Sequence, residues 1–457
     1  MQSTASQRLR SNLSELPAAA PVEVFRPGCR EEVASIVRGF AGRNPGVTLR
    51  AISSGRNWGL GSGSSPSPDT AVMDLSGLRG VRAIDPERGF AVVEAGVTQT
   101  RLVEALRGSG RFLNCTASSP ETSVLGNMMD RGVGLRRQRT EDLLGLEVVT
   151  ANGDVDTVGW WPNRHGLAPN RYGLGPSSLG LFPQSNLAIA TAAVVKLLAT
   201  PEETSVVTFA ADDERYSEVV DVLRTLVRDD LTRAVVKLYD RGSSSIYGAG
   251  DATLLGHVCV DGAREVVETK SELVRQRLAG GGARPLSGDD LDRDPLTRAI
   301  RALYRGDVSH SEDVIRATLG TSSDDADTDG RGWIFILPFV PFTGHDLQTA
   351  LRLVRGVAAR TGTEVGTTMN ALDSDTVDLV IAIRFDRRSV TAVGEAHRAL
   401  DELFADLVEH GFSPYRLDTS HARSDVLSAD GLESRVAHGV KAALDPHQLF
   451  GSTRYLA

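Results

Sequence analysis

The sequence predicts an α+β protein made of two main units, and three observations support this prediction. Residues 22–200 mix strand and helix patterns with a strong hairpin signal, and a different pattern begins at Pro201. From residue 333 the pattern alternates between strand and helix, which is typical of an antiparallel sheet covered by helices on one face. The length of 457 residues allows two to four domains and a large core.

The first unit opens with a strand, a helix and a second strand, as judged from its apolar spacing. Helices are expected over residues 31–41 and 100–107, the second capped by Thr98 or Thr100. The turn Ala151-Asn152-Gly153 predicts a hairpin. The expected strands of this unit are residues 22–26, 47–53, 70–75, 81–85, 91–94, 146–150, 155–158 and 187–197.

The second unit has fewer but longer predicted elements. Its expected strands are residues 235–239, 254–260, 333–339 and 377–385, and its expected helices are residues 212–227, 265–278, 347–360 and 392–410. The acidic stretch 322–332 is expected to be a surface loop or partly disordered. We therefore expect domains over residues 1–200 and 201–410, followed by a C-terminal segment, 411–457.

Composition and charge exclude several classes of protein. The net charge of -9 and the pI near 5.6 argue against nucleic-acid binding, which favours a basic face. Three dispersed cysteines suit neither a disulfide framework nor a metal site, and the histidines show no metal-binding spacing. The first 20 residues lack the apolar stretch of a secretory signal, and no apolar run is long enough to span a membrane. A cytoplasmic protein is the expectation.

A loop of small residues carries the clearest chemical signal. The stretch SSGRNWGLG (residues 53–61) directly follows a predicted strand. Glycine permits positive φ angles, and inward-turned N–H groups of such a loop can bind a diphosphate. The pattern is not the dinucleotide-binding fingerprint, which would open a helix. Taken alone, this loop could equally be a surface turn.

Further segments give the loop a family context. The stretches CTASSPETSVLGNMMDRGVG (115–134), GLFPQSNLAIAT (180–191) and LDPHQLFGSTRY (444–455) follow in order. Together they resemble the FAD-binding family of vanillyl-alcohol oxidase and p-cresol methylhydroxylase, over most of residues 20–200 and again from about 333 to the end. The resemblance implies a two-domain fold in which an FAD-binding domain carries a cap domain built on an antiparallel sheet.

The resemblance also implies a set of cofactor contacts, in which loop amides surround the diphosphate and apolar side chains lie along the flavin. The implied FAD contacts are Ser54, Gly55, Arg56, Asn57, Trp58, Gly59, Ser123, Gly126, Asn127, Gly180, Leu181, Phe182, Asn186 and Ile189.

For the substrate, the resemblance points to Tyr415 and Arg416, which match a pair that holds phenolate in phenol-oxidising members. Arginine can neutralise a buried oxyanion, and a tyrosine hydroxyl adds a donor. Alternatively, Tyr415 packs and Arg416 pairs with Asp418 or another surface acid. A third phenolate-binding tyrosine is replaced by Gln99, which stabilises an anion less.

Two further positions follow from the same resemblance. Glu141 or Asp142 matches an acidic residue near the flavin in some members and could act as a base, or either could simply cap a turn. Members of the family often attach the flavin covalently to a histidine or tyrosine on a cap-domain strand. Residues 361–384, the corresponding stretch here, contain neither. Non-covalent FAD is expected, and Cys115 is the only candidate for a covalent link, although a buried structural cysteine explains it as well.

The predicted function is an FAD-dependent oxidase or dehydrogenase that oxidises a small organic substrate by hydride transfer to flavin N5. The substrate could be phenolic or a natural product of a bacterial secondary pathway, and oxygen or another acceptor would reoxidise the flavin. A homodimer is one expectation, without nucleic-acid or membrane partners. The alternatives are a flavin-fold protein that catalyses a non-redox step or only binds a ligand, and a nucleotide-binding protein without flavin.

Overall fold

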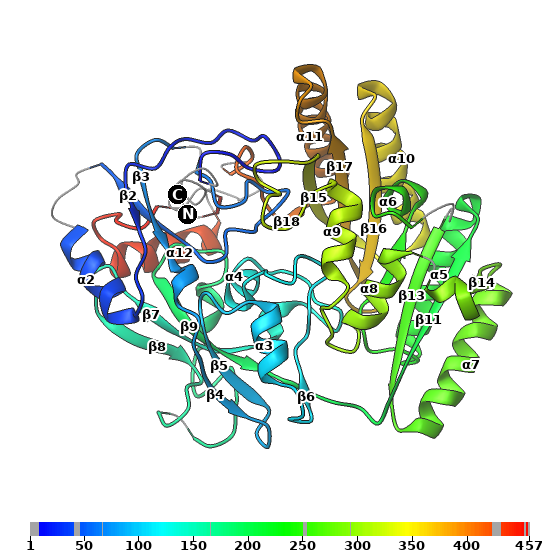
Figure 1. The fold of residues 1–457 in the computed structure, drawn as a ribbon, viewed down its shortest axis with the longest axis horizontal. Coiled ribbons are helices and arrows are strands. Elements are labelled where there is room, and N and C mark those ends of the chain that lie inside the picture. Colours follow the sequence, from blue (N-terminus) through cyan, green and yellow to red (C-terminus); the bar gives the residue numbers. More distant parts are fainter. Residues whose placement is uncertain are drawn as a thin grey trace.

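The computed structural model describes residues 9–40, 46–65, 67–164, 166–249, 254–292, 294–422, 431–451 and 454–455. Within these ranges the chain forms two lobes (Figure 1), which confirms the α+β prediction. None of the helices described there is both long and apolar enough to cross a membrane.

Two sheets organise the N-terminal lobe. A parallel sheet has the strand order β1-β3-β2, and a sheet of antiparallel pairs has the order β4-β5-β9-β7-β8. These strands are β1 (Val24–Phe25), β2 (Thr48–Ile52), β3 (Thr70–Asp74), β4 (Val81–Asp85), β5 (Phe90–Glu94), β7 (Leu143–Val149), β8 (Val155–Gly159) and β9 (Ile189–Lys196). They match the predicted strands to within a few residues, and β7 and β8 form the predicted hairpin.

Short helices complete this lobe. They are α2 (Arg30–Phe40), α3 (Gln99–Ala105), α4 (Val124–Met129) and α12 (Leu432–Leu444). Thr98 caps α3, one of the two expected caps, by accepting a hydrogen bond from the Arg101 N–H at 3.4 Å. Figure 1 shows α12 on this lobe although it lies late in the sequence, and the Leu49 N–H donates to the Leu449 carbonyl at 2.8 Å. A small sheet of β6 (Arg111–Phe112) and β10 (Leu198–Ala199) lies at the exit from the lobe.

The second lobe, called here the cap, is built on an eight-stranded sheet. Its order is β14-β11-β13-β12-β16-β17-β15-β18, and every neighbouring pair is antiparallel. The strands are β11 (Glu203–Ala211), β12 (Val236–Tyr239), β13 (Leu254–Gly262), β14 (Arg284–Pro285), β15 (Gly332–Pro341), β16 (Glu364–Ala371), β17 (Thr376–Phe385) and β18 (Pro414–Arg416).

Helices cover the cap sheet unequally. The larger helices α5 (Tyr216–Arg228), α7 (Arg264–Gly280), α10 (Gly344–Thr361) and α11 (Val390–Glu409) share one hydrophobic core with the outer face of the sheet. The shorter helices α6 (Arg241–Ile246), α8 (Pro295–Leu303) and α9 (Ser311–Leu319) lie on the side towards the N-terminal lobe (Figure 1). Because side chains alternate between faces along a strand, every second residue of the central strands points towards that lobe.

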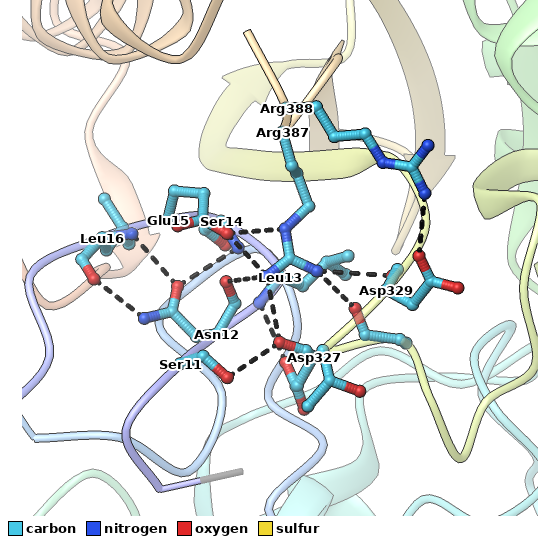
Figure 2. Close-up of polar contacts among 12 residues, drawn as sticks. Ser11, Asn12, Leu13, Ser14, Glu15, Leu16, Asp327, Asp329, Arg387 and Arg388 are labelled. Carbon is cyan, nitrogen blue, oxygen red and sulfur yellow. Dashed lines mark hydrogen bonds and ion pairs between the residues drawn. The ribbon is translucent and has the colours of Figure 1, made fainter. Parts of the chain in front are cut away.

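The acidic stretch 322–332 forms a loop with exposed residues at 324, 325, 328 and 329, as expected of a surface loop, but one of its acids is buried. Asp327 is buried, and its carboxylate accepts hydrogen bonds from the Leu13 N–H (2.9 Å), the Ser62 hydroxyl (2.6 Å) and the Trp58 indole (3.3 Å). The Arg387 guanidinium donates to the Asp327 carbonyl at 3.0 Å (Figure 2). The buried carboxylate was not predicted, because acidic residues at a lobe junction can be satisfied by partners far away in the sequence.

Candidate cofactor and substrate site

A cavity of about 410 Å³ lies between the two lobes. The loop of residues 53–62, the start of α4 and residues 184–190 line it from the N-terminal lobe. The inner face of the cap sheet and helices α8 and α9 line it from the other side. A cavity at the junction of two lobes is the usual position for a cofactor and its substrate.

The glycine loop has the backbone conformation that the sequence predicted. Gly55, Gly59 and Gly61 adopt φ angles of +69°, +78° and +99°. The loop also folds on itself, since the Ser62 N–H donates to the Asn57 carbonyl at 3.0 Å. Gly59 lies against the cap, where the Phe335 N–H donates to its carbonyl at 3.0 Å. The loop is therefore held in place from both lobes.

The start of α4 packs directly against this loop. The Ser123 hydroxyl caps the helix by accepting from the Gly126 N–H at 2.9 Å, and the Ser123 N–H donates to the Ser54 hydroxyl at 3.0 Å. A Cβ atom at Gly126 would lie 2.3 Å from the Ser53 hydroxyl oxygen, so only glycine fits without a shift. Small residues on both segments bring two sets of backbone amides to one wall.

The charges of the cavity suit an anionic group such as a diphosphate. Arg50, Arg416 and Arg454 line it beside one carboxylate, Asp130, which contacts Arg416 at 2.6 Å and Arg454 at 3.0 Å. Burial opposes the ionisation of Asp130, but the two arginines attract the carboxylate and lower its pKa to about 2. Three guanidinium groups beside one carboxylate leave positive charge for a ligand phosphate to balance.

Two buried amide oxygens also favour a bound group. The side-chain oxygens of Asn127 and Asn186 line the cavity walls and have no hydrogen-bond partner among the described residues. Since buried polar atoms are normally paired, these positions suit a ligand with hydrogen-bond donors. FAD, with a diphosphate and a polar flavin edge, fits both the charge and the orphaned acceptors.

Most of the FAD contacts implied by the resemblance lie together in this cavity. Those that line it are Ser54, Gly55, Arg56, Asn57, Trp58, Ser123, Gly126, Asn127, Asn186 and Ile189. Those that do not line it are Gly59, Cys115, Gly180, Leu181 and Phe182. Gly59 instead supports the loop from behind, and Gly180 and Leu181 are exposed, so residues 184–190 provide the lining in that region.

On the cap side, the cavity has an aromatic wall and a polar floor. Tyr239, Tyr247, Trp333 and Phe335 form the wall, with ring centroids of successive contacts 4.5–5.8 Å apart. Edge and tilted contacts at such distances stabilise aromatic clusters. An aromatic wall of this kind suits a flat organic ligand.

The floor contains Lys237, Asn370 and Asp378, each of which is buried. The Lys237 ammonium donates to the Asn370 side-chain oxygen, and the Asn370 amide donates to Asp378 at 3.0 Å. Burial raises the pKa of Asp378 to about 6, although Asn370 and Lys237 counteract the shift. Burial also lowers the pKa of Lys237 to about 8.

Tyr415 and Arg416 both line the cavity, but their partners differ from the sequence alternatives. Tyr415 stacks on Phe339, with ring centroids 4.4 Å apart and planes at 9°. Arg416 pairs with the buried Asp130 and not with Asp418, whose carboxylate accepts from the His421 ring at 2.8 Å. The alternative pairing with Asp418 or a surface acid is therefore wrong, because Asp130 approaches from the N-terminal lobe.

The other residues suggested by the resemblance lie outside the cavity lining. The Gln99 side chain is fully buried and holds the loop before α4, with its oxygen accepting from the Thr116 N–H at 2.8 Å. Asp142 is buried and accepts from Arg137 at 2.8 Å and from Asn114 at 2.7 Å, whereas Glu141 is exposed. None of these three side chains faces the cavity: Gln99 and Asp142 hold neighbouring loops through hydrogen bonds, and Glu141 lies on the surface.

Cys115 is also buried away from the cavity lining. Burial raises the pKa of its thiol to about 12, so the thiol stays protonated. This environment is that of a packed core cysteine.

Sequence reasoning missed Lys237, Asn370, Asp378, Asp130 and Arg454 as site residues. The sequences around Lys237 (Lys-x-Tyr) and Asn370 (Asn-Ala) match no known motif, so nothing in the local sequence identified these positions as site residues. Only the scarcity of lysine, four residues against 46 arginines, could have drawn notice to Lys237.

Comparisons with known proteins agree with this geometry. Residues 21–159 match the family model described as an FAD binding domain. The 1'-carboxy-chondrochloren decarboxylase of Chondromyces crocatus is 28% identical over 94% of this chain and 90% of its own length. The 4-cresol dehydrogenase flavoprotein subunit of Pseudomonas putida is 24% identical over 89% of this chain and 83% of its own.

Solved structures share the whole fold. Substrate-bound p-cresol methylhydroxylase superposes with a TM-score of 0.88 at 21% identity, over 99% of this chain and 92% of that one. The 4-ethylphenol oxidase of Gulosibacter chungangensis gives 0.86 at 22% identity, over 99% of this chain and 93% of that one. Taken with the cofactor cavity, these findings support an FAD-dependent oxidoreductase that has an FAD binding domain and shares the fold of p-cresol methylhydroxylase.

Proposed function

We propose that this flavoenzyme oxidises a small phenolic, or otherwise anionic aromatic, substrate. The observation that carries the proposal is the position of Tyr415 and Arg416 in the same cavity as the FAD loop and the aromatic wall. Bound FAD would supply the hydride acceptor, at flavin N5. The residues of the chain would bind the substrate, orient it and move its proton.

Tyr415 suits the role of a hydrogen-bond donor to the substrate oxygen. Burial raises its pKa well above the usual value, and the nearby Asp378 acts in the same direction, so the phenol keeps its proton. The stack on Phe339 fixes the ring, and the Gln184 side chain donates to the Tyr415 carbonyl at 2.8 Å. The donor is thus held in place before a substrate arrives.

Arg416 would supply the charge that a phenolate needs. It shares Asp130 with Arg454, and one carboxylate cannot neutralise two guanidinium groups. The remaining positive charge lies next to Tyr415 and would favour a bound oxyanion.

Asp378 is the acid in the cavity that we propose as proton acceptor, in place of Glu141 or Asp142. Its pKa is raised by burial to about 6, close to the range in which a general base works well. The Tyr415 hydroxyl lies close enough to lower that pKa through a hydrogen bond.

We also propose the wider setting. Residues 1–200 would form the FAD domain and residues 201–410 the cap, with residues 411–457 returning to the FAD domain. Oxygen or another acceptor would reoxidise a non-covalently bound flavin. The enzyme would act in the bacterial cytoplasm, in secondary metabolism. The net charge of -9 argues against nucleic acid or an anionic membrane surface as a partner. A homodimer would be the first assembly to test.

The test is anaerobic flavin reduction followed by absorbance. We expect 4-ethylphenol to reduce the flavin of the wild type, and Arg416→Ala to slow this reduction about 100-fold, because removing the partner of a buried anion costs several kcal/mol. The bound FAD content of the variant should change far less. Equal loss of FAD binding and of reduction would refute the substrate role of Arg416.

A second candidate is a non-redox decarboxylation, favoured by the decarboxylase of C. crocatus that matches 94% of this chain. In that reaction the bond to the carboxylate breaks, carbon dioxide leaves, and the electron pair stays on carbon and takes up a proton. A labelled aromatic acid that releases carbon dioxide while the flavin stays oxidised would support it. Reduction of the flavin in step with release would instead favour oxidation.

A further inference from the structure

Five polar side chains form one row across the cap sheet. The registers place Thr208 opposite His257, His257 opposite Lys237, Lys237 opposite Asn370, and Asn370 opposite Asp378. Residues directly opposite each other in antiparallel strands point to the same face. The row therefore crosses the sheet through five strands on the face that lines the cavity, and all five residues are buried.

Lys237 is the unusual member of this row. Within the described part of the chain it donates one hydrogen bond, to Asn370, and it forms no ion pair with an acidic side chain. An ammonium has three N–H donors, so a neutral amide leaves two of them unused. A buried cation without a close counter-ion is costly and is normally compensated by an anion.

No neighbour of Lys237 in the described part of the chain places an anion in direct contact with its ammonium group. On one side, burial and the Lys237 charge lower the pKa of His257 to about 3, so its ring is neutral, and it lies 3.1 Å from the Thr208 hydroxyl. On the other side, the Asp378 charge acts to raise the pKa of Lys237, but the Asn370 side chain lies between the two groups and hydrogen-bonds to both, so this carboxylate does not contact the ammonium. The Tyr239 ring, 5.4 Å from the ammonium, gives a further weak contact.

We propose that Lys237 binds a carboxylate of the substrate. This inference rests on the proposed function and deepens it: the substrate would be an aromatic acid, with its ring along the aromatic wall and its oxidised or hydroxylated end near Tyr415. Two free N–H donors and one positive charge match the two oxygens of a carboxylate. Asn370 positions the ammonium from the sheet side.

The test compares two probes of the same shape that the flavin does not oxidise. The binding of 4-hydroxybenzoate and of neutral 4-hydroxybenzamide to the FAD-loaded protein is measured by the perturbation of flavin absorbance. We expect the wild type to bind the acid at least ten times more tightly than the amide. Lys237→Met should weaken acid binding about 30-fold or more, the effect of removing one partner of a buried charge pair, and leave amide binding within about threefold.

A second variant guards against a folding failure. Asn370→Asp keeps the lysine but gives it an internal carboxylate, so it should also abolish the preference for the acid. Lys270→Met is the matched control, because Lys270 on α7 lies outside the cavity lining and contacts Asp230. It should bind both probes as the wild type does. FAD content and the melting temperature verify that each variant is folded.

The outcomes separate this inference from the proposed function. If the wild type binds acid and amide equally, or if Lys237→Met keeps the preference, the carboxylate site is wrong, although phenol oxidation could still stand. If plain benzoate binds as tightly as 4-hydroxybenzoate and Tyr415→Phe changes neither, the phenol site is wrong, whereas the Lys237 site stands.

Discussion

Gly59 joins the FAD loop to the cap, and its replacement by alanine should be severe. A Cβ at this position would lie 2.1 Å from Cδ2, 2.7 Å from Cγ and 3.0 Å from Cβ of Phe335. The φ angle of +78° adds backbone strain of about 1–2 kcal/mol for a residue with a Cβ. Overpacking against a ring adds about 1–3 kcal/mol. We therefore expect Gly59→Ala to lower the free energy of unfolding by about 2–5 kcal/mol.

Gly55→Ala is the matched control on the same loop. Its φ angle is +69°, yet a Cβ there would meet its nearest described atom, the Gly63 Cα, only at 3.9 Å. In this variant only the backbone strain should lower the free energy of unfolding, by about 1–2 kcal/mol. Urea unfolding of the FAD-loaded and FAD-free proteins measures the difference, and titration with FAD measures the effect on the loop itself.

A double-mutant cycle with Phe335→Ala identifies the cause. If the ring is the obstacle, the combined variant should be more stable than the sum of the two single effects predicts, by about 1–3 kcal/mol. Equal losses for Gly59→Ala and Gly55→Ala, together with additive effects in the cycle, would refute the reasoning. Backbone strain would then explain the whole effect.

Three other predictions follow from the site. Asp327→Ala should raise the dissociation constant of FAD about tenfold, because Ser62 and Trp58 lose a shared hydrogen-bond acceptor. Asp325 is exposed, so Asp325→Ala should leave the dissociation constant unchanged. FAD titration measures both variants. Cys115→Ala should keep its FAD, and acid precipitation should release yellow flavin from both proteins; a yellow wild-type pellet would contradict this. The pKa of Asp378 rises from 3.8 to about 6 on folding, so its stability contribution is present below pH 4 and is lost as the pH rises through 6. Asp378→Asn should remove up to about 3 kcal/mol of this dependence in urea unfolding, and an unchanged pH profile would count against it.

The cofactor side of the cavity was largely predictable because its backbone conformations require particular residue types in the local sequence. Glycines with positive φ, a serine helix cap and the turn of a hairpin each need particular residues at fixed spacing. The loop of residues 53–61 and the α4 segment therefore stood out, and ten of the implied contacts line the cavity. Gly59 and the segment 180–182 were exceptions, since a family motif does not say which of its residues face the ligand.

The substrate side could not be predicted in the same way. Lys237 and Asn370 lie 133 residues apart and meet only through the register of β12 and β16. Strand β16 was not predicted at all, because its sequence, EVGTTMNA, is polar on one face and short of large apolar residues. Strand β11 and helices α8 and α9 were also missed. Without these elements, the row across the sheet has no basis in sequence.

The cofactor side and the substrate side of the cavity differ in how substitutions can alter them, for a physical reason. A diphosphate is held by amides that every residue possesses, so the FAD loop constrains only size and φ. A substrate is selected by side chains on a rigid sheet, where one substitution alters charge without disturbing the ladder. At the floor, replacing Lys237 or Asp378 would change which acid or phenol enters while Gly55, Gly59 and Gly126 still shape the cofactor wall. Specificity in this fold should therefore vary along the β12–β16–β17 row before it varies at the FAD loop.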